Sequence, residues 1–387
     1  MQKLLAMNGD QAIAYAWKQI DPDVVAAYPI TPQTIIVEAF SEYVADGHVT
    51  TEYVCTESEH SAMSLCIGAS AAGARTATAT ASAGLAFMWE MLYIAASMRL
   101  PIVMAVANRA LSGPINIHCD HSDAMGGRDA GWVQVYGENA QEAYDNTIMA
   151  FRIAEHLNVR LPVMTCLDGF ITSHSLENMS LLPDDVVKKF VGDFKPIRPL
   201  LDVSEPTSYG PFDSPEYYFE HKYQQVRAME DAFPVIKEVQ KEFAEISGRS
   251  YDLIEPYRAD DADYIVMAAG STAGTLRQVV DELRAEGKKV GSLKLRLFRP
   301  FPAKEIAKIL EGKKGVAVMD RAISFGASGP TFPEVRSALF DSTSKPNIVD
   351  YVYGLGGRDV GVDDIKVVFS QLMKGESKTI NYLGVRI

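Results

Sequence analysis

The feature that most constrains the fold is a series of short, almost wholly apolar segments separated by helix-forming ones. LPIVMAVAN (100–108) and VRLPVMTCLDG (159–169) have few polar positions, so as strands they would be buried on both faces. DVVAAYPI (23–30), TEYVCT (51–56) and RTATATAS (75–82) are further strand-like segments of the same half of the chain. Buried strands connected through helices are typical of parallel sheets that helices cover on both faces. The sequence therefore predicts an α/β fold.

A second unit of the same kind follows toward the C-terminus. Four more strand-like segments alternate with helix-forming ones, at 263–270, 289–298, 315–320 and 346–354. Because 387 residues exceed the usual size of one domain, we expect two. The predicted ranges are 1–245 for the first domain and 246–387 for the second.

A proline-rich segment at about 176–220 interrupts the first domain. Its prolines exclude regular structure over most of that range, at Pro196, Pro199, Pro206, Pro211 and Pro215. Many aromatic and aliphatic residues lie between them, too apolar to be left in water, so we expect an extended arm rather than a linker. The helix-forming segment after the arm is expected to be interrupted or kinked near Pro234.

The charge balance restricts the partners. With 50 acidic and 37 basic residues the formal net charge is −13, and there is no basic run. We therefore expect neither nucleic acid nor an anionic membrane surface as a partner. No apolar stretch reaches the ~18 residues that span a bilayer, and the first residues do not resemble a signal peptide. These features predict a cytoplasmic protein.

Neither the cysteines nor the glycine-rich segments predict a metal or ligand site. Four separated thiols, Cys55, Cys66, Cys119 and Cys166, cannot supply the clustered ligands of an iron–sulfur centre, and we expect buried, inert thiols. GSTAGT (270–275) and GLGGRD (354–359) resemble phosphate-binding turns only in part. We do not expect either to bind a ligand.

Three polar motifs follow predicted strands, where parallel-sheet proteins bind ligands. The turn Tyr28–Pro32 leaves Thr31 at the carboxyl edge of the sheet. Glu59 opens a helix whose same face continues with apolar residues, so its carboxyl group needs a specific partner or must hold its proton tightly. Arg109 follows an apolar strand, and a loop with two His and two Asp extends to Asp123. Together they form a candidate anion-binding and polar site.

Each motif also has a structural explanation. The first turn could be only a rigid helix start, and acidic residues complement the dipole at a helix N-terminus, which suits Glu57 better than Glu59. The His and Asp side chains of the long loop have structural partners available. We therefore expect no metal site on this chain.

Long motifs nevertheless resemble a known family. AAYPITPQT, ESEHSAMS, ATASAGLAFMWEMLYIAAS and ANRALSGPINIHCDHSDAMGGRDAGW together resemble the alpha subunit of the pyruvate:ferredoxin oxidoreductases, the multi-subunit form of the 2-oxoacid:ferredoxin oxidoreductase family. The likeness covers essentially the whole chain, including the proline-rich arm. It implies that the first domain binds the pyrimidine ring of thiamine diphosphate and that the second is similar to the C-terminal domain of transketolase.

The resemblance also implies partners and cofactors. A beta subunit would supply the diphosphate and Mg²⁺ half of the thiamine site, and gamma- and delta-type subunits would complete a dimer of hetero-oligomers. The [4Fe-4S] clusters would lie on partner subunits, coenzyme A would be the co-substrate and ferredoxin the electron acceptor. The implied reaction is the oxidative decarboxylation of pyruvate to acetyl-CoA.

Roles for individual residues follow from the same resemblance. Glu59 resembles the glutamate that shares a proton with the pyrimidine ring. Thr31 resembles the residue that hydrogen-bonds the substrate carboxylate, and Arg109 resembles the guanidinium that pairs with it. These three are the catalytic residues that the resemblance implies, and with Pro29 they are also the cofactor-binding residues.

Three other functions stay open. Branched-chain 2-oxoacid (2-oxoisovalerate) members of the family share much of the 108–123 loop, whereas 2-oxoglutarate is disfavoured. A non-catalytic scaffold subunit with the same fold is disfavoured because Thr31, Glu59 and Arg109 are all present. A self-sufficient thiamine-dependent lyase of the acetolactate synthase type is disfavoured because no diphosphate and metal motif is recognisable.

Overall fold

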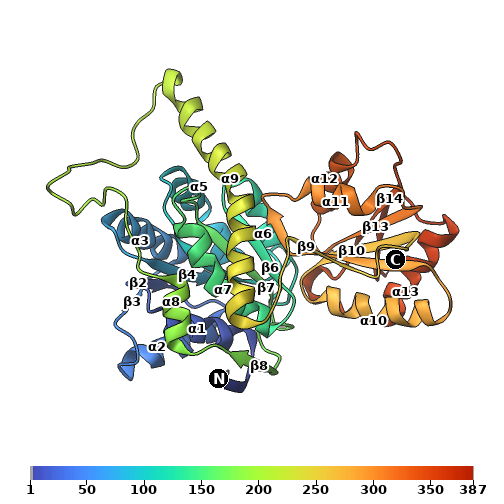
Figure 1. Cartoon of the computed structure of the whole chain (residues 1–387), viewed down its shortest axis with the longest axis horizontal. Coiled ribbons are helices and arrows are strands. Elements are labelled where there is room, and N and C mark those ends of the chain that lie inside the picture. The colour runs from blue at the N-terminus through green and yellow to red at the C-terminus, as the bar shows by residue number, and fades with distance from the viewer. Residues whose placement is uncertain (1–2, 387) are drawn as a thin grey trace.

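The computed structural model describes residues 3–386 and contains two sheet units side by side (Figure 1). Residues 1, 2 and 387 of the two predicted domain ranges lie outside this described part. The first unit has a seven-stranded sheet in the order β12-β6-β7-β5-β4-β2-β3. Its strands are β2 (Val24–Ala27), β3 (Glu52–Cys55), β4 (Thr76–Thr80), β5 (Val103–Asn108), β6 (Val133–Gly137), β7 (Val163–Asp168) and β12 (Leu297–Arg299). All pairs except β12–β6 are parallel.

Helices cover both faces of this sheet, as predicted for strands without a polar face. They are α1 (Gly9–Ile20), α2 (Thr34–Ala45), α3 (Glu59–Ala72), α4 (Ser82–Phe87), α5 (Trp89–Ser97), α6 (Ser122–Gly126), α7 (Ala140–Glu155), α8 (Asp184–Val191) and α9 (Pro215–Ser247). Alternate residues of β5 face opposite cores: Val103 packs with α1, α2, α7 and α9, whereas Met104 packs with α3, α4 and α5. A two-stranded antiparallel sheet joins β1 (Lys3–Met7) to β8 (Glu177–Leu181).

The second unit contains a six-stranded sheet in the order β15-β14-β13-β10-β11-β9. Its strands are β9 (Ile254–Tyr257), β10 (Tyr264–Ala269), β11 (Val290–Leu295), β13 (Gly315–Asp320), β14 (Asn347–Val352) and β15 (Ile380–Tyr382). Its helices are α10 (Thr272–Ala285), α11 (Ala303–Leu310), α12 (Thr331–Ala338) and α13 (Val362–Lys374). Between residues 3 and 386, no helix has the length and apolarity needed to cross a bilayer.

The segment 289–298, predicted as one strand of the second unit, belongs to both units. β11 lies in the second sheet, but the chain then turns at Arg296 and β12 pairs antiparallel with β6 of the first sheet. The Tyr136 amide donates to the Arg296 carbonyl at 2.7 Å where the chain passes between the sheets. One apolar core therefore extends from the first sheet into the second unit, and includes Met164 and Val316.

The proline-rich arm is shorter than predicted. The range 176–220 contains β8, α8 and the start of α9, and the one long stretch of it without a helix or strand is 192–214. Pro215 begins α9, where its missing N–H costs no hydrogen bond. Of the two alternatives expected near Pro234, an interruption is wrong, because α9 continues through this proline while Val235, Ile236 and Phe243 pack into the core.

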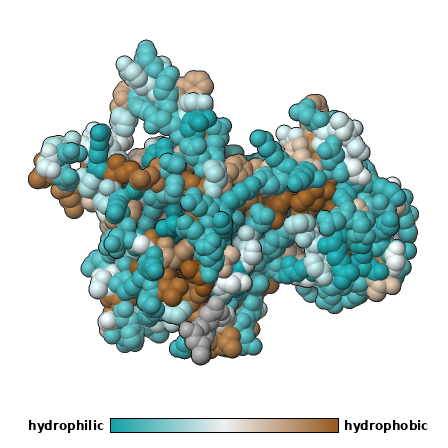
Figure 2. Space-filling view, viewed as in Figure 1, coloured by the Kyte–Doolittle hydropathy of each residue, from teal (hydrophilic) through white to brown (hydrophobic). Residues whose placement is uncertain are grey.

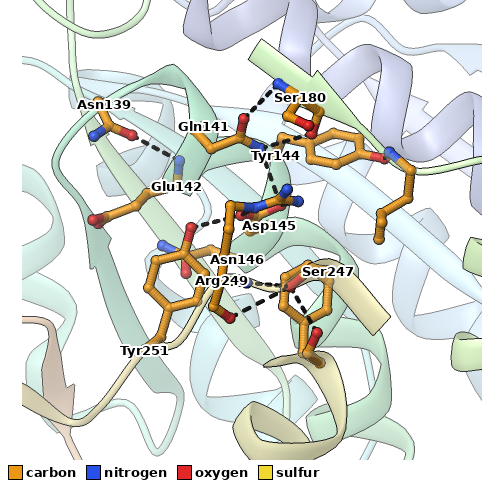
Figure 3. A network of polar contacts seen from close by, with 12 residues as sticks. Asn139, Gln141, Glu142, Tyr144, Asp145, Asn146, Ser180, Ser247, Arg249 and Tyr251 are labelled. Carbon is orange, nitrogen blue, oxygen red and sulfur yellow. Dashed lines mark hydrogen bonds and ion pairs between the residues drawn. The ribbon is translucent and has the colours of Figure 1, made fainter. Parts of the chain in front are cut away.

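The connection after α9 is held by a buried carboxylate (Figure 3). Asp145 of α7 accepts two hydrogen bonds from the Arg249 guanidinium, at 2.6 and 2.8 Å. The Tyr251 hydroxyl donates to the same carboxylate at 2.5 Å. A bidentate pair of this kind fixes direction as well as distance, so the start of the second unit has a defined position on the first.

Burial of the cysteines is confirmed for three of the four. Burial raises the pKa of the Cys66 thiol to about 12 and raises the pKa values of Cys119 and Cys166 well above the usual range. Cys55 is exposed, contrary to expectation. It ends β3, the edge strand of the first sheet, so one side of this strand has no neighbouring strand to cover it.

Candidate active site

The three predicted site residues follow strands β2, β3 and β5 at the carboxyl edge of the first sheet. Thr31 lies beyond β2, Glu59 begins α3 directly after β3, and Arg109 comes immediately after β5. β4 separates β2 from β5 in the sheet, and its last residue, Thr80, lies at the same edge. The order of strands therefore gathers side chains that are far apart in the sequence.

Thr31 and Arg109 are in direct contact. Nη1 of Arg109 donates to the Thr31 carbonyl at 2.8 Å, and Nε donates to the Asn116 carbonyl at 2.9 Å. Arg109 is buried and Thr31 is exposed. Within residues 3–386, neither the Thr31 hydroxyl nor Nη2 of Arg109 has a hydrogen-bond partner. Both groups are therefore free to bind a ligand.

The turn that carries Thr31 is fixed by Gln33. Its side-chain oxygen accepts from the Ile30 amide at 3.2 Å, while its nitrogen donates to the Ala79 carbonyl of β4 at 2.8 Å. Pro29 belongs to this turn and is exposed. The turn is thus attached to the strand that lies between Thr31 and Arg109.

Glu59 lies at the buried start of α3, with 7% of its surface exposed. Ser58 caps the helix by accepting a hydrogen bond from the Ser61 amide. In the part of the chain that the structure describes, the Glu59 carboxyl has no hydrogen-bond or ion-pair partner, and it touches neither Thr31 nor Arg109 through such a bond. A buried carboxyl without a partner is costly, and such groups cluster at functional sites.

Two neighbours of Glu59 were missed by the sequence analysis. A side-chain carbon on Gly84 would lie 2.7 Å from Glu59 Oε1 and 2.6 Å from Thr80 Oγ1, so only glycine fits between them. Thr80 Oγ1 is buried and has no hydrogen-bond partner in the described chain. Gly84 sits within the motif ATASAGLAF, but a glycine after a strand indicates only a turn until its neighbours are known.

Asp123 is a third residue whose position matters and whose role was not predicted. Its carboxylate is fully buried and accepts four hydrogen bonds: from the amides of Ser82, Arg109 and Ala124 at 2.9, 3.0 and 2.7 Å, and from the Asn108 side chain at 2.8 Å. Burial raises the pKa of Asp123 to about 6. This residue joins the turn after β4 to the end of β5, and so holds the backbone of Arg109 beside the turn that contains Gly84.

His121 of the His- and Asp-rich loop pairs with a buried carboxylate of the first sheet. His121 Nε2 lies 2.7 Å from Asp168 Oδ1, and Arg321 of the second unit donates to Asp168 Oδ2 at 3.0 Å. Although burial would raise it, His121 and Arg321 hold the pKa of Asp168 below its usual range. Cys119, His121 and Asp168 are close enough together to ligate a metal, but Arg321 already neutralises this carboxylate.

A second acidic group, Glu138, Glu142 and Glu255, is also close enough to ligate a metal. It surrounds the buried ammonium of Lys294, which pairs with all three carboxylates. In each cluster, a cationic side chain of the second unit pairs with the carboxylates.

Two family models match this chain. Residues 15–241 match the model described as "Pyruvate flavodoxin/ferredoxin oxidoreductase, thiamine diP-bdg", and residues 262–365 match "Pyruvate:ferredoxin oxidoreductase core domain II". The chain is 57% identical over 384 residues to the pyruvate synthase subunit PorA of Thermotoga maritima, covering 99% of this chain and 98% of that protein. It is 47% identical to PorA of Methanocaldococcus jannaschii, over 100% of this chain and 99% of the relative.

Two further similar proteins are named for other 2-oxoacid substrates. The ketoisovalerate oxidoreductase subunit VorA of Pyrococcus abyssi is 46% identical, over 95% of this chain and 93% of that one. A solved structure of the 2-oxoglutarate:ferredoxin oxidoreductase from Magnetococcus marinus has a TM-score of 0.73 at 19% identity. That likeness covers 95% of this chain but only 65% of the larger one, and at this identity it reports the fold alone.

Proposed function

Because the chain belongs to the pyruvate flavodoxin/ferredoxin oxidoreductase family, we propose that it is the alpha subunit of a pyruvate:ferredoxin oxidoreductase. The reaction converts pyruvate and coenzyme A into acetyl-CoA and CO₂, and its electrons pass singly to ferredoxin through iron–sulfur clusters on partner subunits. Relatives named pyruvate synthase subunit PorA match this chain over nearly their whole length, which supports pyruvate as the substrate.

The observation that carries this proposal is the contact between Arg109 and Thr31 at the edge of the sheet. A 2-oxoacid presents a carboxylate to its binding site. The planar guanidinium of Arg109 is held by two carbonyl groups and has N–H donors left over for such a carboxylate. The exposed Thr31 hydroxyl provides a second donor beside it. The pair therefore suits a small anionic substrate.

Thiamine diphosphate fits the other half of the site, around Glu59. The carboxyl of Glu59 and the hydroxyl of Thr80 lack partners in the described chain, and Gly84 leaves the space between them free of side-chain atoms. An aminopyrimidine has both donor and acceptor nitrogens, so it can satisfy buried groups of this kind. When bound, thiamine diphosphate supplies the carbanion chemistry of decarboxylation. Glu59 holds a proton at the ring, while Arg109 and Thr31 hold the substrate.

The proposed function is tested by the choice of substrate. We expect the complex purified with its partner subunits to use pyruvate with a kcat/KM about 10-fold or more above that for 2-oxoisovalerate, because pocket contacts with one extra methylene already discriminate by about 10- to 200-fold. The measurement is the coenzyme A-dependent reduction of ferredoxin with each 2-oxoacid in turn.

Two outcomes would change the assignment. A higher kcat/KM for 2-oxoisovalerate would select the branched-chain alternative, which the VorA relatives support. If no 2-oxoacid reduced ferredoxin although thiamine diphosphate was bound, the chain would be a scaffold subunit with the same fold.

Partner subunits are proposed to cover apolar surfaces that this chain leaves open. Figure 2 shows apolar residues at the surface of the projecting arm. On and next to the arm, Leu201, Phe212 and Phe219 are 76%, 101% and 75% exposed, and beside the site Phe87 and Ile115 are 59% and 82% exposed. Apolar side chains gathered in this way mark interaction surfaces. The arm is our candidate for part of the inter-subunit contact.

Iron analysis tests whether the iron–sulfur clusters lie on partner subunits and not on this chain. We expect the chain expressed alone to contain no iron, because its three buried thiols lie on separate elements and Cys55 stands alone at the surface. Iron and acid-labile sulfide are measured on the isolated chain and on the complex, which is the positive control. Stoichiometric iron in the isolated chain would contradict the assignment of the clusters to partners.

We propose that residues up to about 245 form the pyrimidine-binding domain and that the rest is a transketolase C-terminal-like domain. The end of α9 at Ser247 and the start of the second sheet at Ile254 support this division. Mg²⁺ and the [4Fe-4S] clusters are assigned to beta, gamma and delta-type partners in a cytoplasmic dimer of hetero-oligomers.

A further inference from the structure

We propose that the second unit positions Arg109 by clamping the 110–121 loop through the side chain of Asn116. The turn at 354–357, within the GLGGRD motif that suggested no function, is the part of the second unit that makes this clamp. The proposal rests on the proposed role of Arg109 as the partner of the substrate carboxylate. It makes Asn116 a positioning residue, which acts on substrate only through Arg109.

A continuous path of hydrogen bonds joins the two units at this point. Arg109 Nε donates to the Asn116 carbonyl at 2.9 Å, and Asn116 Nδ2 donates to the Gly356 carbonyl at 3.0 Å. The side-chain oxygen of Asn116 also accepts from the His118 amide at 2.6 Å, so both ends of this amide are used. The position of the Asn116 carbonyl, and with it that of the guanidinium, therefore depends on a residue 240 positions away.

Further contacts hold the loop against the same turn. The Gly356 amide donates to Asp120 Oδ2 at 3.0 Å, and the Gly357 amide donates to the Cys119 carbonyl at 2.7 Å. Beyond them the His121 amide donates to the Arg321 carbonyl at 2.8 Å. The second unit thus binds the loop backbone or side chains at four positions after Ile115: Asn116, Cys119, Asp120 and His121.

The two glycines of the turn explain why the motif is rich in glycine. Gly356 and Gly357 have φ values of +58° and +78°, which favour glycine. A side-chain carbon on Gly356 would lie 2.8 Å from Asn116 Nδ2, and one on Gly357 would lie 2.3 Å from His118 Cβ. The motif therefore permits close approach to the loop, and this accounts for it without a bound phosphate.

Other hydrogen bonds hold the loop at its base, where the Ala110 amide donates to the His118 carbonyl at 3.0 Å and the Leu111 amide donates to the Ser122 hydroxyl at 3.1 Å. Residues 111–115, which directly follow Arg109 and Ala110, are all exposed. Half of the support for the Arg109 side chain comes from this loop, through the Asn116 carbonyl, and the other half from Thr31. Orientation of a charged group contributes to binding only while its supports are fixed, so loosening the loop should weaken substrate binding.

The proposal is tested with a double-mutant cycle in the assembled complex. We expect Asn116→Ala to raise the KM for pyruvate by about 2- to 30-fold, the usual range for residues that act on a site without touching its ligand. In an Arg109→Ala background the same substitution should leave KM unchanged, because the group that it positions is gone. A role in stability alone would lower the melting temperature equally in both backgrounds and would not move KM.

A second pair of variants approaches the clamp from the other unit. Gly356→Ala should raise KM in the same way as Asn116→Ala, because the added carbon displaces the Asn116 amide. Gly375→Ala is the matched control: its φ is +70°, so the substitution strains the backbone similarly, but nothing lies within 4 Å of the added carbon. The control should leave KM unchanged even where it lowers the melting temperature.

The results separate failure of the clamp from failure of the proposed function. If Arg109→Ala raises KM but Asn116→Ala and Gly356→Ala do not, the clamp is overturned and the role of Arg109 stands. If Asn116→Ala raises KM by the same factor with and without Arg109, the residue acts by another route and the proposal is wrong. If Arg109→Ala itself leaves KM unchanged, the proposed function of Arg109 fails and the clamp fails with it.

Discussion

Glu59→Gln is expected to leave the complex assembled and to lower its turnover by about 10²- to 10⁴-fold, the usual effect of removing a general acid–base group. The substitution nearly preserves shape, so the close packing of this side chain against Gly84 should survive. Gln has no proton that it can exchange with the cofactor ring. The measurements are kcat with pyruvate at saturating coenzyme A, and the thiamine diphosphate content of the purified complex.

The matched control for this experiment is Glu57→Gln. Glu57 lies two residues earlier, is exposed and accepts a hydrogen bond from the Ser61 hydroxyl, which lowers the pKa of its carboxyl. Its replacement should leave kcat within about 2-fold, since exposed charges away from a site contribute little. If Glu59→Gln kept more than half of the wild-type turnover with cofactor bound, Glu59 would not be the proton-sharing residue.

Arg109→Ala is expected to raise the KM for pyruvate by about 10- to 150-fold, which corresponds to the ~1.5–3 kcal/mol of a charged hydrogen bond. The substrate carboxylate is present when pyruvate binds and leaves later as CO₂. Removing the guanidinium that pairs with it should therefore weaken the binding of pyruvate more than it slows the later steps. Thiamine diphosphate affinity should change little, because Glu59 makes no hydrogen bond or ion pair with Arg109. Initial rates over a range of pyruvate concentrations measure KM, and a cofactor titration measures the affinity.

Two further variants test the geometry of this arginine. Arg109→Lys keeps the charge but loses the planar fork, so it should rescue KM only in part. Arg128→Ala is the control, because Arg128 donates to the Met125 carbonyl and lies outside the proposed site. Arg109 also supports the Asn116 and Thr31 carbonyls, so its loss should lower the melting temperature as well. An unchanged KM with only a lower melting temperature would show that Arg109 is structural.

Much of the framework could be predicted from local pattern. Apolar runs such as 100–108 and 159–169 predict strands buried on both faces, because no polar position is available to face water. The structure has β5 and β7 there, side by side and parallel. Likewise Asn8 caps α1 with a capping box formed with Gln11, only three residues away. These features depend on the residues within one turn or strand, which a sequence displays directly.

The candidate site was predictable only in outline. Polar residues that follow apolar strands indicate the carboxyl edge of a sheet, and Thr31 and Arg109 do meet there. The partners that fix them were not predictable, because Asp123, Gly84 and Thr80 gain their roles from strand order rather than from spacing. In the sequence alone, Gly84 is equally consistent with a turn, Thr80 with an ordinary strand residue and Asp123 with a helix start.

What only the tertiary structure decided is the way in which the two units are joined. The exchange of β12 into the first sheet, the pairing of Asp168 with Arg321, and the contact of Asn116 with Gly356 all join residues more than 100 positions apart. Hydrophobic periodicity determines which faces are buried but not which buried faces meet. The sequence by itself determined two sheets covered by helices and a polar edge on the first. The packing of one sheet unit against the other determined which residues hold that edge in place, because contacts between segments far apart in the chain leave no local pattern in the sequence.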